Sequence, residues 1–209
     1  PRVPHPRFVG KSGMGPRGDA ILEADWCVGQ LLNTLDRYGI ADNTIVVFSS
    51  DNGPVLDDGY KDDANEKLGN HTPWGPLRGG KYSLFDAGAH VPFMVRWKGT
   101  IEPGVSDALV CQMDLLASFA KLTKQENKSA DSQDILAALT GKSTTGRENL
   151  VIEATGRVCF REGDWIMIPP HKGRAINNKW VNIETGNLDE YQLYNVSEDP
   201  GQKENLAEK

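Results

Sequence analysis

Residues 44–50, Thr-Ile-Val-Val-Phe-Ser-Ser, constrain the fold more than any other part of the chain. Four consecutive apolar residues interrupt any polar and apolar alternation in this run. An uninterrupted apolar strand is typical of a parallel strand that is covered on both faces. We therefore expect a central strand here, with helices packed on both sides of its sheet.

The residues on either side of this run supply the expected helices. A helix is predicted at 19–38, with Gly39 placed as its C-terminal cap. Its apolar positions share one face: Ile21, Leu22, Val28, Leu31, Leu32 and Leu35. A second buried strand is predicted at 91–97, followed by helices at 114–122 and 132–139. This order of elements indicates an α/β fold.

The pattern changes after about residue 145, where helical periodicity disappears. Short β-rich runs separated by turn residues follow, at 150–153, 158–160, 165–168, 179–183 and 191–195. Runs of this kind favour a small antiparallel sheet. We therefore divide the chain into an α/β part at 1–147 and a β-rich subdomain at 148–209.

Composition narrows the classes of function. The 209 residues carry a formal net charge of −6, which argues against nucleic-acid binding because no basic face is available for phosphates. No apolar run approaches the roughly 20 residues of a membrane helix. The three cysteines, Cys27, Cys111 and Cys159, are far apart and indicate neither a zinc site nor a disulfide framework.

The segment Ser49-Ser50-Asp51-Asn52-Gly53 is the first candidate for a chemical site. It follows the predicted strand directly, and ligand sites in open α/β sheets gather at that edge. A carboxylate next to an amide oxygen suits Ca²⁺ or Mg²⁺. The alternative is a hairpin turn, since Asn-Gly between apolar runs favours a type I′ turn.

The second candidate lies in the long polar loop at 54–80, and loops of that length are usually functional. Near its end, Arg78 and Lys81 flank a pair of glycines, so they could hold an anion close to the backbone. The alternative is a surface turn with solvated basic residues. By itself, His71 is an ordinary loop histidine as readily as a functional one.

Taken together, these segments resemble the C-terminal part of a type I, formylglycine-dependent sulfatase of the alkaline phosphatase superfamily. The resemblance rests on residues 38–53, which end in Ser-Ser-Asp-Asn-Gly, and on residues 77–92, Leu-Arg-Gly-Gly-Lys-Tyr-Ser-Leu-Phe-Asp-Ala-Gly-Ala-His-Val-Pro. The ending Leu-Tyr-Asn-Val-Ser-Glu-Asp-Pro at 193–200 is similar to the closing segment of that family.

The resemblance implies a partial alkaline-phosphatase-like sandwich with a small C-terminal antiparallel β subdomain. It implies hydrolysis of sulfate esters, on a sulfated carbohydrate or an aryl sulfate, with Ca²⁺ or Mg²⁺ held by Asp51 and Asn52. Lys81 is implied as the catalytic cation on the sulfate, with His71 and Arg78 as substrate-binding residues. The family also implies a secreted, periplasmic or lysosomal location, which this sequence does not test because a signal peptide is not observable.

The sequence departs from the family at its nucleophile. No cysteine or serine here begins the Cys/Ser-x-Pro/Ala-x-Arg motif that yields formylglycine. The N-terminal half of the same enzyme is expected to supply it as a partner, so the 209 residues should be inactive alone. The family histidine that protonates the leaving alcohol matches His5 only weakly.

Two other functions stay open from the sequence. A phosphodiesterase or phosphatase of the same superfamily would use similar tetrahedral chemistry, although such enzymes carry more Asp and His ligands. A non-catalytic carbohydrate-binding fragment would use Trp74, Trp165 and Trp180 as stacking faces.

Overall fold

The computed structural model describes residues 3–179 and 181–209. The first part contains α1 (Gly15–Arg37), η1 (Ala41–Asn43), β1 (Ile45–Ser49), η2 (Asp86–Gly88), β2 (Phe93–Trp97), α2 (Asp114–Leu122) and α3 (Leu136–Leu139). The second part contains β3 (Asn149–Ala154), β4 (Arg157–Glu162), β5 (Trp165–Ile168), β6 (Ile176–Asn177), β7 (Ile183–Glu184) and β8 (Gln192–Asn195). No helix in the described ranges is long and apolar enough to cross a membrane.

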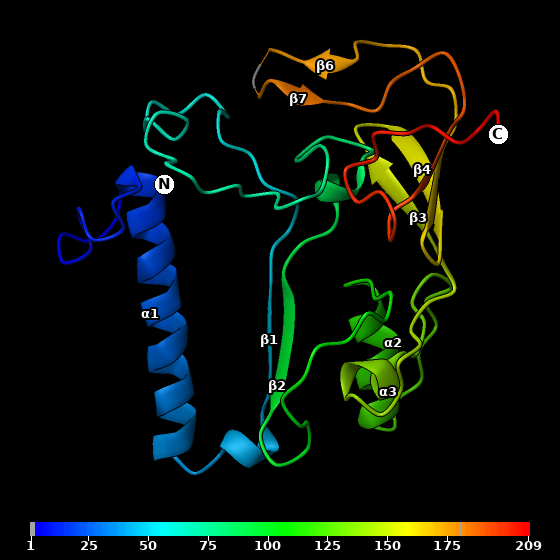
Figure 1. Cartoon of the computed structure of the whole chain (residues 1–209). Coiled ribbons are helices and arrows are strands. Elements are labelled where there is room, and N and C mark those ends of the chain that lie inside the picture. The colour runs from blue at the N-terminus through cyan, green and yellow to red at the C-terminus, as the bar shows by residue number, and fades with distance from the viewer. Residues whose placement is uncertain (1–2, 180) are drawn as a thin grey trace.

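The strand predicted at 44–50 is present as β1, but its predicted parallel pairing is wrong. β1 pairs with β2 in antiparallel register, from Ile45 opposite Trp97 to Ser49 opposite Phe93. The faces of the pair are also partly open, since Phe48 is 42% exposed. An apolar run indicates that both faces of a strand tend to be buried. It does not indicate whether the neighbouring strand runs parallel or antiparallel. Figure 1 shows this pair standing between α1 and the two short helices α2 and α3.

The first helix begins four residues before its predicted start. The buried carboxylate of Asp19 accepts hydrogen bonds from the backbone N–H groups of Gly10 and Ser12 at 2.8 and 2.9 Å. These bonds fold the preceding loop onto the first turn, and Pro16 suits that turn because it needs no backbone donor there.

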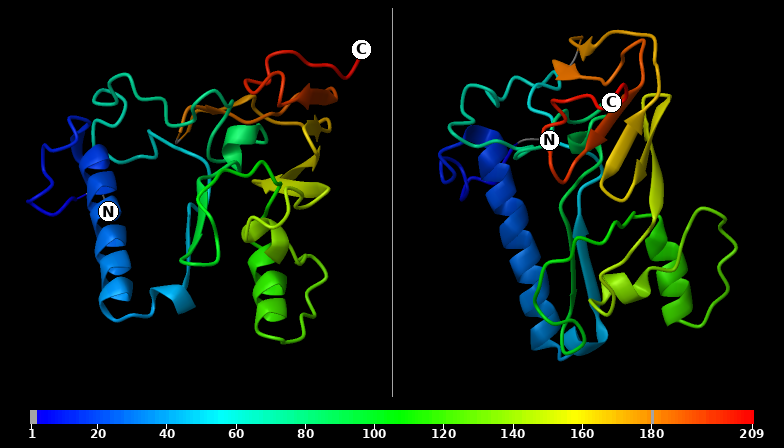
Figure 2. Two further views of the ribbon diagram at one scale, coloured as in Figure 1. Left: turned by 60° about the horizontal axis from the view of Figure 1, so that its bottom comes forward. Right: turned by 45° about the vertical axis from the view of Figure 1, so that its right-hand side comes forward.

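The predicted apolar face of α1 is only partly covered by other described residues. Ile21 is 59% exposed and Leu31 is 53% exposed. Figure 1 and the left-hand view of Figure 2 show α1 standing apart from the β1–β2 pair. The other apolar positions on this face that are less exposed, Val28, Leu32 and Leu35, are half-buried.

Residues from 149 onward form the predicted antiparallel sheet. Its strand order is β3-β4-β5-β8, and each neighbouring pair is antiparallel. The run predicted at 179–183 appears only as the ribbon of β6 and β7, and Trp180 lies outside the described residues. The expected α3 is also shorter, at four residues. The domain boundary at 147 and 148 stays a prediction.

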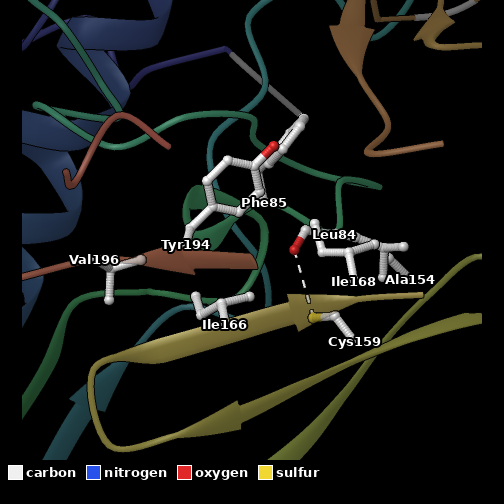
Figure 3. Packing of buried hydrophobic residues seen from close by; sticks show 8 residues of the cluster. All are labelled: Leu84, Phe85, Ala154, Cys159, Ile166, Ile168, Tyr194 and Val196. Atoms are coloured by element: carbon white, nitrogen blue, oxygen red, sulfur yellow. Dashed lines mark hydrogen bonds between the residues drawn. The ribbon is translucent and has the colours of Figure 1, made fainter. Parts of the chain in front are cut away.

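The main core joins this sheet to the loop that follows Lys81. Figure 3 shows Leu84 and Phe85 from that loop packed against side chains of the sheet and of the segment after β8. Leu84 is 1% exposed and its carbonyl accepts from the Cys159 thiol, 3.5 Å away. The ring of Phe85 meets Tyr194 edge-on, with centroids 6.1 Å apart. The C-terminal sheet thus anchors the loop that carries Lys81.

Candidate functional site

Asp51 and Asn52 lie just beyond the C-terminal end of β1, as predicted. Asp51 is exposed, and its carboxylate makes no hydrogen bond or ion pair with the described residues. Asn52 is half-buried, and its Nδ2 donates to the carbonyl oxygen of Gly53 at 2.9 Å. That bond leaves the Asn52 amide oxygen available as an acceptor.

The alternative of a two-residue hairpin at this position is wrong. After Gly53 the chain enters the loop at 54–80, and the strand that pairs with β1 begins only at Phe93. The Asn-Gly pair therefore does not reverse the chain into a neighbouring strand. Asp51 and Asn52 instead lie in the irregular segment that connects β1 to this loop.

The donors at this edge suit part of a site for a hard cation. One carboxylate and one amide oxygen are the ligand types that Ca²⁺ and Mg²⁺ take. Calcium needs about six to eight oxygen ligands. Among residues 3–179 and 181–209, no three acidic, histidine or cysteine side chains are grouped so that they could hold a metal. Asp51 and Asn52 therefore fit as a fraction of a calcium shell.

Two backbone hydrogen bonds bring the Asp51-Asn52 segment beside the loop of Lys81. The N–H of Gly53 donates to the carbonyl of Gly88 at 2.8 Å, and the N–H of Lys81 donates to the carbonyl of Pro54 at 3.0 Å. A Cβ atom at Gly53 would lie 1.7 Å from the carbonyl oxygen of Ala87. A Cβ at Gly80 would lie 2.6 Å from the Pro54 oxygen. Glycine is thus needed for backbone packing at Gly53 and Gly80. The close approach of a ligand to the glycine pair stays a prediction.

Lys81 is half-buried and carries a cation with no acidic partner among the described residues. Its Nζ lies 5.3 Å from the ring centroid of Tyr82, which also has a positive φ of 75°. A positive φ is uncommon for a tyrosine and marks a tightly constrained turn. The fold therefore holds the Lys81 backbone firmly while its charge stays uncommitted.

Arg78 makes contacts that differ from the predicted substrate contact. Its Nε and Nη2 donate to the two carboxylate oxygens of Glu184 at 2.8 and 2.7 Å. Its Nη1 donates to the carbonyl of Gln202 at 2.7 Å, and the guanidinium lies 3.9 Å from the centroid of Phe85. The hydrogen bond from Arg78 lowers the pKa of the Glu184 carboxyl. These contacts give Arg78 a packing role, and its binding of substrate stays a prediction.

The two candidate histidines lie in different surroundings from each other. His71 is exposed in the 54–80 loop and lines a cavity of about 290 Å³ between that loop and α1. His5 is also exposed, with its backbone N–H bonded to Glu23 at 2.8 Å and its Nδ1 accepting from the Arg7 N–H at 3.3 Å. The substrate role of His71 and the acid role of His5 stay predictions.

One residue at the site escaped prediction. The side-chain amide of Gln112 reaches the end of β1 and bonds to Ser49 and Ser50, immediately before Asp51. The contact spans 62 residues and belongs to no motif. Nothing in the local sequence could therefore have indicated it.

Comparison with known proteins places this geometry in a family. The family model described as Sulfatase matches residues 5–125. The N-acetylgalactosamine-6-O-sulfatase of Bacteroides thetaiotaomicron is 49% identical over 211 residues, covering 99% of this chain and 41% of the relative. Human arylsulfatase A is 29% identical, covering 95% of this chain and 40% of that protein. The chain thus spans about two fifths of the length of the curated relatives that it matches.

Solved structures share the fold over the same extent. A Bacteroides thetaiotaomicron structure described under the metabolism of multiple glycosaminoglycans superposes with a TM-score of 0.95, at 48% identity over 99% of this chain and 44% of that one. A sulfatase from Pseudoalteromonas superposes with a TM-score of 0.77 at 24% identity, over 97% of this chain and 41% of that chain, and shows the fold alone. The chain belongs to the sulfatase family, where it corresponds to about two fifths of a glycan-sulfatase-like fold.

Proposed function

We propose that these residues supply part of the active site of a sulfatase that removes sulfate esters from sulfated glycans. The observation that carries the proposal is the pair of backbone bonds that sets Asp51 and Asn52 beside the Lys81 loop. In this proposal, a cation held by Asp51 and Asn52 and the ammonium group of Lys81 bind the same anionic ester.

The role of each residue follows from its chemistry. Asp51 would hold Ca²⁺ with its carboxylate, and Asn52 would add its amide oxygen. The bound cation would supply electrostatic stabilisation of charge on the sulfate oxygens. Lys81 would place a fixed positive charge on the same group, where its attraction grows as negative charge develops.

The nucleophile is expected from outside these residues. None of the three cysteines is followed by x-Pro-x-Arg. Burial also raises the pKa of the Cys159 thiol to about 12, so it stays protonated at neutral pH. The full-length protein, meaning these 209 residues joined to the expected N-terminal half, is therefore the unit that would carry out hydrolysis.

The proposed substrate is a glycan that carries N-acetylgalactosamine 6-sulfate. The support is the 49% identity to a relative named for that substrate, which extends over 99% of this chain. Sequence similarity over the whole length favours a related glycan more than a small aryl ester. It also supports sulfate chemistry over the phosphatase alternative.

The test is a substrate panel with the full-length protein. We expect sulfate release from N-acetylgalactosamine 6-sulfate to exceed release from the 4-sulfate by roughly 100-fold or more in kcat/KM, since a site built for one ester position leaves polar groups unpaired with the other. A calcium chelator should abolish release, and added Ca²⁺ should restore it. Faster hydrolysis of the matching 6-phosphate, or turnover that survives chelation, would contradict the proposal.

A further inference from the structure

Gln112 connects the start of α2 to the end of β1. Its Nε2 donates to the hydroxyl oxygen of Ser49 at 2.8 Å and to the carbonyl oxygen of Ser50 at 2.6 Å. These two residues are the last before Asp51. The Gln112 side chain therefore helps to fix the backbone just ahead of the candidate calcium ligands.

Ser49 extends this connection to the neighbouring strand. Its hydroxyl donates to the carbonyl of Pro92 at 3.0 Å while accepting from Gln112. The end of β1 is thus bonded to the residue before β2 on one side and to Gln112 on the other. The two bonds of Ser49 lie two residues before Asp51, and the bond from Gln112 to Ser50 lies one residue before it.

The support behind Gln112 is rigid. Asp114, two residues further along, is fully buried and accepts from Nε and Nη2 of Arg147 at 2.7 Å each. The same carboxylate accepts from the backbone N–H groups of Cys111 and Gln133 at 3.2 and 2.9 Å. A buried ion pair with these additional bonds holds the segment around Gln112 in one position.

On the side of β1 that Gln112 contacts, the described residues leave open space. A cavity of about 380 Å³ lies there, lined by Ser49, Ser50, Asp51, Gln112 and Leu115, among others. A backbone segment beside open space is not positioned by packing. The two bonds from Gln112 therefore carry the constraint on this side of the strand.

We infer that Gln112 is a positioning residue, which fixes the direction in which Asp51 and Asn52 leave β1 and thereby raises calcium affinity. The inference rests on the proposed calcium site. Gln112 is uncharged, so its effect is geometric: a ligand set held in place before binding loses less conformational freedom when the ion arrives.

The test measures Ca²⁺ binding to metal-stripped full-length protein by titration calorimetry. The substitution Gln112→Met keeps the side-chain length and removes the amide. We expect about a 10-fold weaker Kd, in line with the loss of groups that orient metal ligands from behind. Because two hydrogen bonds are lost, the Tm of the metal-free protein should fall by only a few degrees. Gln112→Asn, which is polar but one methylene too short, gives the same test if the Met variant does not fold.

The matched control is Gln125→Met, just beyond the other end of α2. Gln125 is exposed, and among the described residues its Nε2 bonds only to the Thr123 carbonyl at 3.4 Å, so calcium affinity should not change. A lower Tm with unchanged calcium affinity in Gln112→Met would overturn the inference.

A second variant separates the two ideas. If Asp51→Asn weakens calcium binding while Gln112→Met and Gln112→Asn do not, the inference fails and the proposed site stands. If Asp51→Asn also leaves calcium affinity unchanged, the proposed site fails and the inference fails with it.

Discussion

Asp86 is the residue that ties the Lys81 loop most tightly to the C-terminal part. It is 4% exposed, and its carboxylate lies 2.8 Å from Nδ1 of His90 and 3.1 Å from Nη1 of Arg161 on β4. Its backbone N–H donates to Oε1 of Gln202 at 2.7 Å. Asp86 is separated by 75 and 116 residues from two of these partners, so no local pattern predicts the contacts.

His90 should make part of the stability depend on pH. The hydrogen bond to Asp86 raises the pKa of His90 above its ordinary value, and this outweighs burial and the nearby Arg161, which both lower it. A histidine with a raised folded-state pKa stabilises fully below its unfolded pKa of about 6.5. That stabilisation is lost as pH rises through the higher folded-state pKa.

The measurement is the Tm of full-length protein and of His90→Gln between pH 5.5 and 8.5. We expect the variant to be less stable than the wild type at pH 5.5, with the difference shrinking as pH rises above neutrality. In an Asp86→Asn background the same substitution should show no such pH dependence. A Tm difference that stays constant across the range would contradict the assignment.

At the scale of elements, the site depends on two loops whose backbones touch. Gly53→Ala would place a methyl group 1.7 Å from the carbonyl oxygen of Ala87, and backbone atoms on both sides leave no flexible side chain to move. We expect a loss of about 3 kcal/mol in the free energy of unfolding, at the upper end of overpacking effects. Urea denaturation of the full-length protein measures it.

Gly104→Ala is the matched control for this substitution. A Cβ at Gly104 meets no atom within 4 Å, and Gly104 has no positive φ. Its free energy of unfolding should stay the same or rise by about 0.4–1 kcal/mol, because alanine narrows the unfolded ensemble. If both substitutions lowered the free energy of unfolding equally, the effect of Gly53→Ala would not come from the contact between the two loops.

Elements were predictable where their signal is local. The predicted bounds of α2 and β5 agree with the structure, since a helical apolar stripe and a short apolar run between turns lie within a few residues. The start of α1 was not predictable, because it depends on hydrogen bonds from the backbone of Gly10 and Ser12 to the Asp19 carboxylate. The direction of the β1 pairing also escaped, because its partner lies more than 40 residues away.

The candidate site shows the same division. The Asp51-Asn52 pair and Lys81 stand out as two motifs in the sequence. Their proximity depends on bonds between Gly53 and Gly88 and between Lys81 and Pro54, which spacing alone does not encode. The packing role of Arg78 depends on Glu184, 106 residues away, and was unpredictable for the same reason.

At the scale of the whole molecule, the exposed surface is unusually large. The accessible surface is 13447 Å² for a mass of 22.9 kDa. A compact monomer of that mass exposes roughly 9,600 Å². The excess includes apolar side chains on α1, where Ile21 and Leu31 are more than half exposed. This excess fits a chain that spans 41% of a longer relative, and we expect the rest of the full-length protein to cover these faces.

The most direct test compares sulfate release by four proteins: the 209-residue chain, the full-length protein, its Lys81→Ala variant and a control lysine variant. With Ca²⁺ present, the full-length protein should hydrolyse N-acetylgalactosamine 6-sulfate. Lys81→Ala should lower kcat about 100-fold or more, as expected when a fixed charge on the transferring group is lost. The control Lys128→Ala, an exposed lysine between α2 and α3, should retain full activity. The 209-residue chain should release no sulfate. Metal-dependent turnover by that chain alone, or full activity of Lys81→Ala, would contradict the proposed division of the active site.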